Sequence, residues 1–278
     1  MTIHSIDTGL FKLDGGAMFG VVPRVLWEKL VPPDSRNLCT WAMRCLLLDD
    51  GAGRLTLVDT GIGTKQDAKF FAHYDLHGDA TLQGSLARLG VGLADITDVF
   101  LTHLHFDHCG GAVRCDGDRL LPTFPRAAYW SNRRHWQWAT EPNAREKASF
   151  LRENILPLQE SGQLRFVEDG SLPPGIADIF YADGHTDQMM LPLVRYNGRT
   201  LAYCADLLPS HTHLPIPYVM GYDTRPLLTL DEKTAFLDRA AAENWVLVFE
   251  HDAQHEACTV VRTEKGVRVG EFVRLSEL

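Results

Sequence analysis

Four apolar segments of strand length in this chain each end close to a side chain that can bind a metal ion. The side chains in question are His103, His185, Asp206 and His251. Strands of one sheet can bring their ends to a common edge, so residues from distant parts of the sequence can meet there. The repeated pattern predicts a sheet-containing fold with a site at a sheet edge. Any one of these residues alone would more often be a packed or solvated residue.

The segment 96–101 runs directly into the densest group of candidate ligands. The sequence T-H-L-H-F-D-H-C-G-G places His103, His105, Asp107 and His108 within six residues. Imidazole suits zinc, iron and similar metals, and a carboxylate can join it. Alternate positions cannot all point one way if the chain turns after the strand, and the glycine pair at the end of the motif indicates such a turn. We therefore expect two neighbouring metal sites, His103 and His105 at one and Asp107 and His108 at the other.

Helical and strand patterns alternate along the chain. Strands are predicted at 41–48 and 54–58, joined as a hairpin by a polar turn, and helices at 80–89 and 143–159. Thr229 with Glu232 three residues later resembles a capping box, which predicts a helix running from there to about residue 244. The alternation favours an α/β fold. With 278 residues, we expect one domain covering residues 1–278.

Composition limits the kinds of binding partner and the cellular location that we expect for this chain. The chain has 27 Lys and Arg against 36 Asp and Glu, a formal charge of -9, and no long basic run, which disfavours nucleic acid. No secretory signal pattern opens the sequence and no apolar stretch approaches a bilayer-spanning length, so we expect no membrane partner and a cytoplasmic location. Six cysteines without a C-x-x-C are too sparse for a disulfide framework, and Cys109 and Cys204 are expected to be packing residues.

The motifs together resemble the metallo-β-lactamase-fold superfamily of metal-dependent hydrolases. They are Asp59-Thr60-Gly61, residues 103–108, Gly184-His185-Thr186, Asp206 and His251, in the family's order. The resemblance implies a four-layer αββα sandwich of two mixed sheets flanked by helices. It also implies two divalent metal ions, zinc above iron or manganese, with His103, His105 and His185 at the first, Asp107, His108 and His251 at the second, and Asp206 bridging both. Asp59 would orient a ligand histidine, against the alternative of a plain turn residue.

The implied chemistry is hydrolysis by a hydroxide that bridges the two ions. Paired cations can lower the pKa of a shared water towards neutrality and polarise a carbonyl or phosphoryl group, so no protein nucleophile is needed. Asp107 and Asp206 are the residues we expect to take part in catalysis, Asp206 as the bridge and Asp107 also as a proton carrier to the leaving group.

Features of other family branches that this chain lacks indicate which branch it resembles. The best-known dizinc β-lactamases have cysteine where this chain has Asp206, and flavodiiron proteins have glutamate at the position of His105. Glyoxalase II enzymes add a C-terminal helical domain, whereas 27 residues follow His251 here. Residues 11–20 resemble the glycine-containing N-terminal stretch of lactonases that act on N-acyl homoserine lactones. The lactonase and organophosphate-hydrolase branch is therefore the nearest.

Two departures leave the substrate open. Many homoserine lactone lactonases have tyrosine where this chain has Pro209, and the usual G-H-T-P-G becomes G-H-T-D-Q at 184–188, which alters the turn behind the ligand histidine. Several further residues could either line a substrate pocket or have an ordinary structural role. Met18, Phe19 and Trp27 would more often be core residues, His211 and His213 would more often lie on a solvated loop, and Tyr222 could replace the missing tyrosine only by an accident of folding.

The sequence thus predicts a metal-dependent hydrolase that opens a lactone or cleaves an ester-like or phosphotriester bond. Its partner would be a small-molecule substrate, with a homodimer left open as an assembly. Two alternatives remain at this point: a mononuclear iron-dependent sulfur oxygenase using the three-histidine side, and a non-catalytic ligand-binding member of the same fold. Metal content and turnover separate the three.

Overall fold

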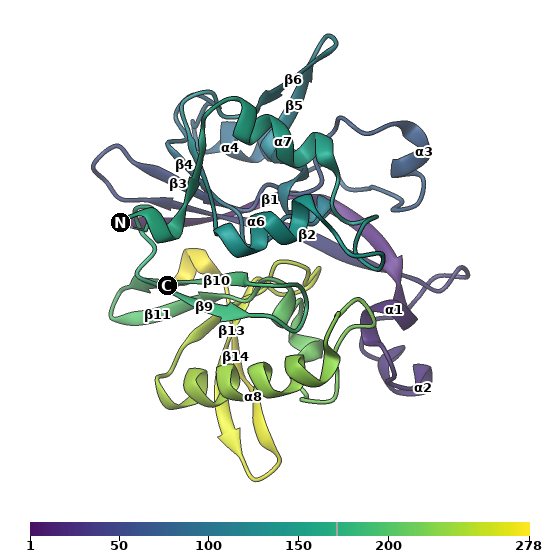
Figure 1. Cartoon of the computed structure of the whole chain (residues 1–278). Helices are drawn as coiled ribbons and strands as arrows, with labels where there is room; N and C mark the ends of the chain where they lie inside the picture. Colours follow the sequence, from purple (N-terminus) through teal and green to yellow (C-terminus); the bar gives the residue numbers. More distant parts are fainter. Residues whose placement is uncertain (171) are drawn as a thin grey trace. The chain divides into compact units, whose positions relative to one another are not determined.

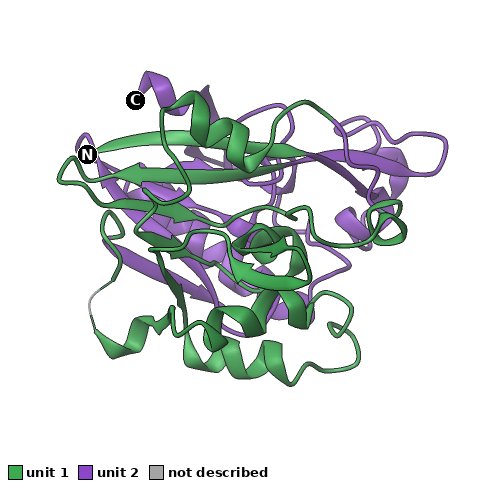
Figure 2. Ribbon diagram, turned by 90° about the horizontal axis from the view of Figure 1, so that it is seen from above, with its two compact units in different colours: residues 1–9, 43–73, 78–176 green, residues 10–42, 74–77, 177–278 purple. Residues whose placement is uncertain are grey.

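The computed structural model describes residues 1–170 and 172–278. Among these residues, the main strands form two six-stranded sheets. The residues divide into two units (Figure 2). Unit 1 comprises Met1–Gly9, Met43–His73 and Gly78–Ile176, and unit 2 comprises Leu10–Ala42, Tyr74–His77 and Ala177–Leu278. Strands β1 (Thr2–Asp14) and β2 (Leu38–Asp49) contribute residues to both. That the whole chain forms one domain stays a prediction.

The sheet of unit 1 has the strand order β1-β2-β3-β4-β7-β8. Its remaining strands are β3 (Leu55–Val58), β4 (Asp98–Phe100), β7 (Ala128–Ser131) and β8 (Leu164–Phe166). Strands β2 and β3 pair antiparallel, with Leu46 opposite Val58, which confirms the predicted hairpin. From β3 to β8 the neighbours are parallel. A separate hairpin joins β5 (Val113–Asp116) to β6 (Arg119–Pro122).

Helices of unit 1 cover its sheet through apolar faces (Figure 1). They are α4 (Leu82–Arg88), α5 (Phe106–Cys109), α6 (Arg133–Thr140) and α7 (Arg152–Glu160), with the 3₁₀ turns η1 (Gly110–Ala112) and η2 (Val167–Asp169). The short helix α3 (Ala68–Phe71) has no buried residue. Leu86 of α4, Trp136 of α6 and Leu158 of α7 are buried in one core with Leu57 and Val99 of the sheet. Burying such a side chain contributes roughly 1.5–3 kcal/mol each, so this packing holds the helices in place.

Helix α7 is shorter than the sequence predicts. A helix was expected from residue 143 to residue 159, but α7 begins at Arg152. The Asn143 side chain accepts hydrogen bonds from the N–H groups of Arg145 and Glu146, at 2.9 and 3.1 Å, which forms a local turn in place of a helix. Contacts of buried Glu146, described below, hold the turn. Tertiary contacts therefore override a favourable helix propensity here.

The sheet of unit 2 has the strand order β14-β13-β12-β11-β10-β9. Its strands are β9 (Asp178–Ala182), β10 (Met189–Tyr196), β11 (Arg199–Tyr203), β12 (Val246–Val248), β13 (Ala257–Thr263) and β14 (Gly266–Val273). Strand β10 is antiparallel to both β9 and β11, and β11 is parallel to β12. Strands β9, β11 and β12 therefore run the same way and end at the same edge of the sheet.

Unit 2 also contains α1 (Gly15–Phe19), α2 (Arg24–Trp27), α8 (Pro226–Ala242) and the 3₁₀ turns η3 (Ala205–Leu207), η4 (His211–His213) and η5 (Leu275–Glu277). Helix α8 begins at Pro226, so the predicted start at Thr229 was wrong: proline occupies the first helical turn, where its missing N–H costs nothing. Phe236 of α8 packs on Phe180 of β9, with ring centroids 5.2 Å apart.

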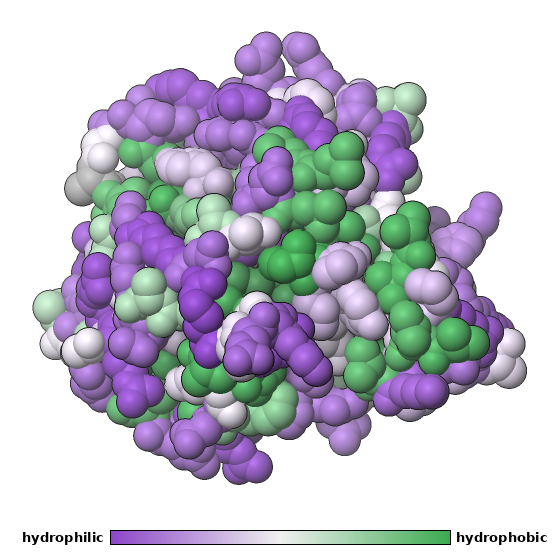
Figure 3. All heavy atoms as spheres, turned by 90° about the horizontal axis from the view of Figure 1, so that it is seen from below, coloured by the Kyte–Doolittle hydropathy of each residue, from purple (hydrophilic) through white to green (hydrophobic). Residues whose placement is uncertain are grey.

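The segment around α1 and α2 has buried aromatic side chains as well as exposed aliphatic ones. Phe19 is fully buried and stacks on Trp27 and on His213, with centroids 5.3 and 4.7 Å apart. Exposed aliphatic side chains surround α2, among them Val21 at 94% and Val25 at 62% exposure, in a region where apolar surface gathers (Figure 3). The core interpretation of Phe19 and Trp27, and of Met18 at 1% exposure, agrees with this burial.

Both units combine a mixed sheet with helices, so the predicted α/β fold of two mixed sheets flanked by helices is confirmed. Among the described residues, no helix combines the length and the apolar composition that crossing a bilayer would require.

Candidate metal centre

The histidine-rich motif of unit 1 leaves the sheet at the carboxyl end of β4. Strand β3 lies parallel to β4, so Asp59 emerges at the same edge, and its N–H donates to the carbonyl of Phe100 at 2.9 Å. His103 and His105 lie on the approach to α5, whereas Asp107 and His108 lie within its single turn. The segment therefore turns after the strand, as the sequence predicts. The ligand-capable atoms of His103 and His105 lie within 4.8 Å of each other, as do those of Asp107 and His108.

His103 and His105 point ring nitrogens at each other. His103 Nε2 and His105 Nδ1 are 3.1 Å apart. The opposite nitrogens have oxygen partners: Thr102 Oγ1 lies 3.1 Å from His103 Nδ1, and Glu146 Oε1 lies 3.4 Å from His105 Nε2. Since Thr102 Oγ1 already donates to Asp59, it accepts from His103, which puts both ring protons on the outer side. The inner nitrogens then present lone pairs, and two nitrogens bound to one tetrahedral zinc are roughly 3.3 Å apart.

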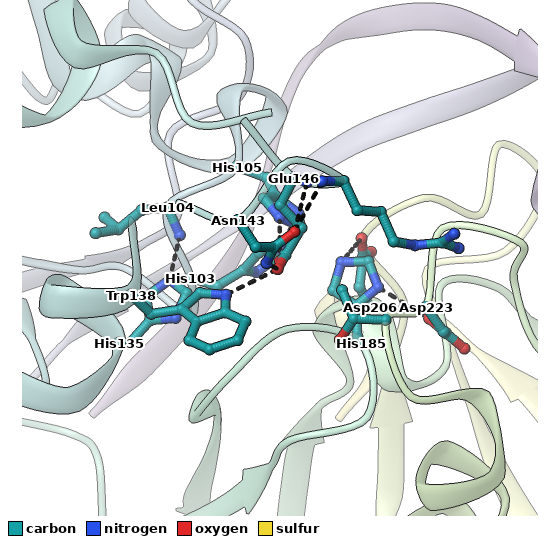
Figure 4. A network of polar contacts seen from close by, with 12 residues as sticks. His103, Leu104, His105, His135, Trp138, Asn143, Glu146, His185, Asp206 and Asp223 are labelled. Carbon is teal, nitrogen blue, oxygen red and sulfur yellow. Dashed lines mark hydrogen bonds and ion pairs between the residues drawn. The ribbon is translucent and has the colours of Figure 1, made fainter. Parts of the chain in front are cut away.

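Glu146 supports His105 from a buried position that the sequence did not indicate. It is 3% exposed, and its Oε2 accepts from Trp138 Nε1 at 2.8 Å and from Asn143 Nδ2 at 2.5 Å (Figure 4). A buried carboxylate with these donors stays ordered and holds the imidazole proton on Nε2. Such a carboxylate–histidine pair typically fixes the tautomer of a metal-binding histidine.

His135 of α6 has a supporting role that the sequence did not indicate. Its Nε2 accepts a hydrogen bond of 2.9 Å from the backbone N–H of Leu104, the residue between His103 and His105 (Figure 4). The ring is fully buried, and the backbone N–H of His135 donates to Asn132 Oδ1, the side chain that caps α6. His135 thus anchors the backbone of the motif to a helix.

Asp59 contacts a motif histidine, as the sequence predicts. Its Oδ1 accepts from Thr102 N at 2.8 Å, and its Oδ2 accepts from Thr102 Oγ1 at 2.7 Å and lies 3.1 Å from His108 Nδ1. The residue is fully buried and has φ 56°, a left-handed conformation that Asp and Asn tolerate better than most residues. The contact holds the His108 proton on Nδ1 and leaves Nε2 for a ligand.

The three candidate ligands of unit 2 follow its three co-directional strands. His185 comes after β9, Asp206 lies in η3 directly after β11, and His251 comes after β12. All three are buried, at 1%, 7% and 1% exposure. The strand directions therefore bring them to one edge of this sheet, as the sequence predicts.

Asp206 lies between the two histidines. Its Oδ2 is 3.1 Å from His185 Nε2, and its Oδ1 is 3.1 Å from His251 Nε2. The outer nitrogens again have acceptors: His185 Nδ1 lies 3.0 Å from Asp223 Oδ1 (Figure 4), and His251 Nδ1 lies 2.8 Å from the carbonyl of Ala42. With those protons outside, the inner nitrogens and the carboxylate oxygens face a common space that calls for positive charge, supplied either by a second ring proton or by a metal ion.

Electrostatics in unit 2 favour positive charge at this cluster. Burial disfavours a charged His185, but the carboxylates of Asp206 and Asp223 outweigh it and raise the pKa of His185 to about 10. A divalent cation would satisfy the same field. Asp223 was not identified from the sequence, because no local pattern connects it with His185, 38 positions away.

The altered turn after His185 has its own support. Glu232 of α8 accepts from the N–H groups of Asp183 and Gly184, at 2.7 and 2.9 Å. Asp187, where the family usually has proline, forms a 2.9 Å ion pair with Arg225. A Cβ at Gly184 would come within 2.4 Å of Thr229, so glycine is required there. The departure from the usual motif therefore leaves the loop firmly held.

The loop after Asp206 differs from the sequence interpretation. His213 is 1% exposed and hydrogen-bonds to Ser210 Oγ and the Met18 carbonyl, at 2.8 and 2.9 Å, so the solvated-loop prediction was wrong for it. Burial lowers its pKa to about 3. His211 is partly buried and bonded to Asp252. Pro209, in place of the family tyrosine, accepts from His251 N at 3.0 Å, and Tyr222 is 41% exposed.

The cysteines near the candidate ligands are inert packing residues. All six thiols are free, and Cys109 and Cys204 are fully buried. Burial raises the pKa of Cys109 to about 12 and that of Cys204 well above its ordinary value. Neither thiolate would form near neutral pH, which agrees with the expected packing role.

The arrangement of motifs on this fold defines a class of protein. The model of the metallo-beta-lactamase superfamily matches residues 44–251, so the chain belongs to that superfamily. Among solved structures, a probable metal-dependent hydrolase from Staphylococcus aureus is 25% identical, with 98% of each chain covered and a TM-score of 0.86.

Two further structures share the fold at lower identity. AidC, a dizinc quorum-quenching lactonase, is 22% identical over 98% of this chain and 95% of its own, with a TM-score of 0.76. The hydrolase AbOPH is 17% identical over 98% and 94%, with a TM-score of 0.78. The fold of the lactonase and hydrolase branch is therefore that of this chain.

Proposed function

We propose that the chain is a dinuclear metal-dependent hydrolase that opens a lactone or cleaves an ester-like bond. The observation that carries the proposal is the same in both units: buried imidazoles whose outer nitrogens contact oxygen acceptors and whose inner nitrogens face another ligand-capable side chain. The proposed ligands are His103, His105, Asp107, His108, His185, Asp206 and His251. Imidazole and carboxylate donors suit divalent ions, zinc above iron or manganese.

The number of ligand side chains supports a pair of metal ions held by residues of both units. Unit 1 offers four ligand side chains and unit 2 offers three. Catalytic zinc commonly takes three protein ligands and keeps a position for water or substrate. His103, His105 and His185 would hold the first ion and Asp107, His108 and His251 the second. Asp206, with one oxygen directed at each of two histidines, would bridge them.

The residues of the chain have distinct tasks in this proposal. When bound, two such ions supply Lewis acidity and lower the pKa of a shared water towards neutrality. Asp59, Glu146 and Asp223 keep the imidazole protons away from the ligand nitrogens. Asp107 has a side chain that is 11% exposed, with Oδ2 3.9 Å from His108 Nε2. Its second oxygen can carry a proton to the leaving group.

The substrate class follows from the fold relatives and stays a proposal. AidC was solved with a product, N-hexanoyl-L-homoserine, and other neighbours are N-acyl homoserine lactone lactonases. We infer a small lactone, aryl ester or phosphotriester as substrate for this chain. The test is turnover by metal-loaded protein on lactones, aryl esters, thioesters and phosphotriesters. Hydrolysis of at least one class is expected, and binding of a lactone without opening it would favour the non-catalytic alternative.

The mononuclear iron oxygenase is less favoured. It would use His103, His105 and His185 and give no role to buried Asp107 and His251. Metal analysis separates the two: about two equivalents of zinc-like metal support the hydrolase, and one iron with thiol-dependent oxygen uptake supports the oxygenase. The homodimer and the cytoplasmic location stay predictions.

A further inference from the structure

Three arginines line a groove on unit 1 at the amino ends of its parallel strands. Arg54 precedes β3, Arg126 precedes β7, and Arg165 lies in β8, and the groove between them has a volume of about 430 Å³. Thr97, which also lines the groove, directly precedes β4, whereas His103 follows the other end of that strand. The groove and the histidine motif therefore lie at opposite edges of the same sheet.

The groove holds more positive than negative charge. Arg54 Nη2 pairs with Asp98 Oδ2 at 2.7 Å, and Arg126 Nη2 lies 3.6 Å from Asp95 Oδ1. Arg165 donates only to carbonyls, those of residues 162 and 164 at 2.8 and 2.7 Å, and forms no ion pair with any carboxylate that the structure describes. Three guanidinium groups thus meet two carboxylates, on a chain whose formal charge is -9.

Hydrogen bonds hold Arg54 and the loop that carries Arg126 in place before any ligand binds. Asp98, which is fully buried, accepts from Trp130 Nε1 at 2.9 Å as well as from Arg54, so it fixes Arg54. Gln163 Nε2 donates to the carbonyls of Phe124 and Ala127, at 3.1 and 2.7 Å, which fixes the loop that carries Arg126. Ordered arginine side chains reduce the entropy lost on binding.

We propose that this groove binds a phosphate ester of about nucleotide size. Guanidinium forks match phosphate oxygens in geometry and charge, and the phosphate would meet the one positive charge that the two carboxylates leave unbalanced. Thr97 and Arg126 also line an adjoining hollow of about 640 Å³ with Asp49 and Asp95, which gives room and hydrogen-bond acceptors for the rest of the ligand. Free phosphate alone would leave most of this space unfilled. The inference is independent of the proposed hydrolase activity.

The test is calorimetric titration of the metal-loaded protein with adenosine monophosphate at fixed ionic strength. Adenosine and inorganic phosphate are titrated in parallel. The double variant Arg126→Gln with Arg165→Gln removes two exposed charges, whereas Arg54 is kept because its loss would leave Asp98 buried without its ion pair. The matched control is Arg114→Gln with Arg119→Gln, two exposed arginines on the β5–β6 hairpin.

We expect saturable binding of adenosine monophosphate, no binding of adenosine, and weaker binding of inorganic phosphate. The groove variant should lose at least tenfold in affinity, and the control variant should keep the wild-type value. Turnover of the groove variant should be unchanged. Equal loss in both double variants would reduce the effect to overall charge, and full affinity in the groove variant would place the phosphate elsewhere, for example at the metal centre. Either result overturns the proposal, as does an absence of binding.

Discussion

Asp59→Asn is the substitution that isolates the orientation of a proposed ligand. Asparagine tolerates the φ of 56° and keeps one oxygen for Thr102 N. In the wild type, Asp59 Oδ2 lies 3.1 Å from His108 Nδ1 and 2.7 Å from Thr102 Oγ1. In the variant, the amide NH₂ takes the place of this oxygen. Two N–H groups cannot face each other, so the His108 proton moves to Nε2, the nitrogen proposed to bind metal. Loss of such an orienting partner typically costs 10- to 100-fold in metal affinity, or about 1.4–2.7 kcal/mol.

The assay is zinc titration of the apoprotein against a competing chelator, followed by metal analysis after dialysis. Wild type should retain about two equivalents, and the variant should lose most of one because His108, a proposed ligand of one ion, presents a proton in place of its lone pair. Asp95→Asn, an exposed position with the same chemical change, is the control and should behave as wild type. Apoprotein melting temperatures exclude misfolding as the cause. Two equivalents retained at unchanged affinity in Asp59→Asn would refute the reasoning.

Three further predictions test other parts of the account. His105→Ala and Asp206→Asn should each lower turnover by at least 10²-fold on whichever substrate the panel identifies, with little change in melting temperature; near-normal turnover in either variant would contradict the ligand assignment. Burial holds the pKa of His213 at about 3, below the 6.5 of an exposed histidine, so the unfolded chain binds more protons between these values and stability falls as pH drops through this window, by up to about 1.4 kcal/mol per pH unit. Urea unfolding at several pH values should give a shallower slope for His213→Gln, and identical slopes would show that His213 titrates normally. Phe19→Ala should destabilise the fold by about 3–5 kcal/mol because its ring is buried between Trp27 and His213, whereas exposed Val21→Ala should change stability by less than about 0.5 kcal/mol; a stable Phe19→Ala with altered substrate preference would instead make Phe19 a pocket residue.

The sequence predicted the placement of the candidate ligands well because each follows a recognisable strand. His185 and His251 come after apolar runs of strand length, and parallel strands end at one edge, so their positions needed no tertiary information. The inferences for the two histidines depend on local periodicity, which sequence records directly. The role of Asp59 beside a ligand histidine was instead implied by the resemblance to the superfamily.

The supporting residues could not be found in this way. Glu146 and Asp223 lie 41 and 38 positions from the histidines they contact, in loops whose residue types suit an exposed turn equally well. The burial that makes each carboxylate effective arises only when the chain packs. The missed start of α8 was different, since Pro226 at a first helical turn is a sequence signal that the apparent capping box obscured.

The most direct test of the central claim is anomalous X-ray diffraction from crystals of the zinc-loaded protein, recorded at the zinc edge. The account predicts two peaks roughly 3.5–4 Å apart, surrounded by the four proposed ligands of unit 1 and the three of unit 2, with Asp206 contacting both. A single peak, or peaks bound by the side chains of one unit alone, would contradict it.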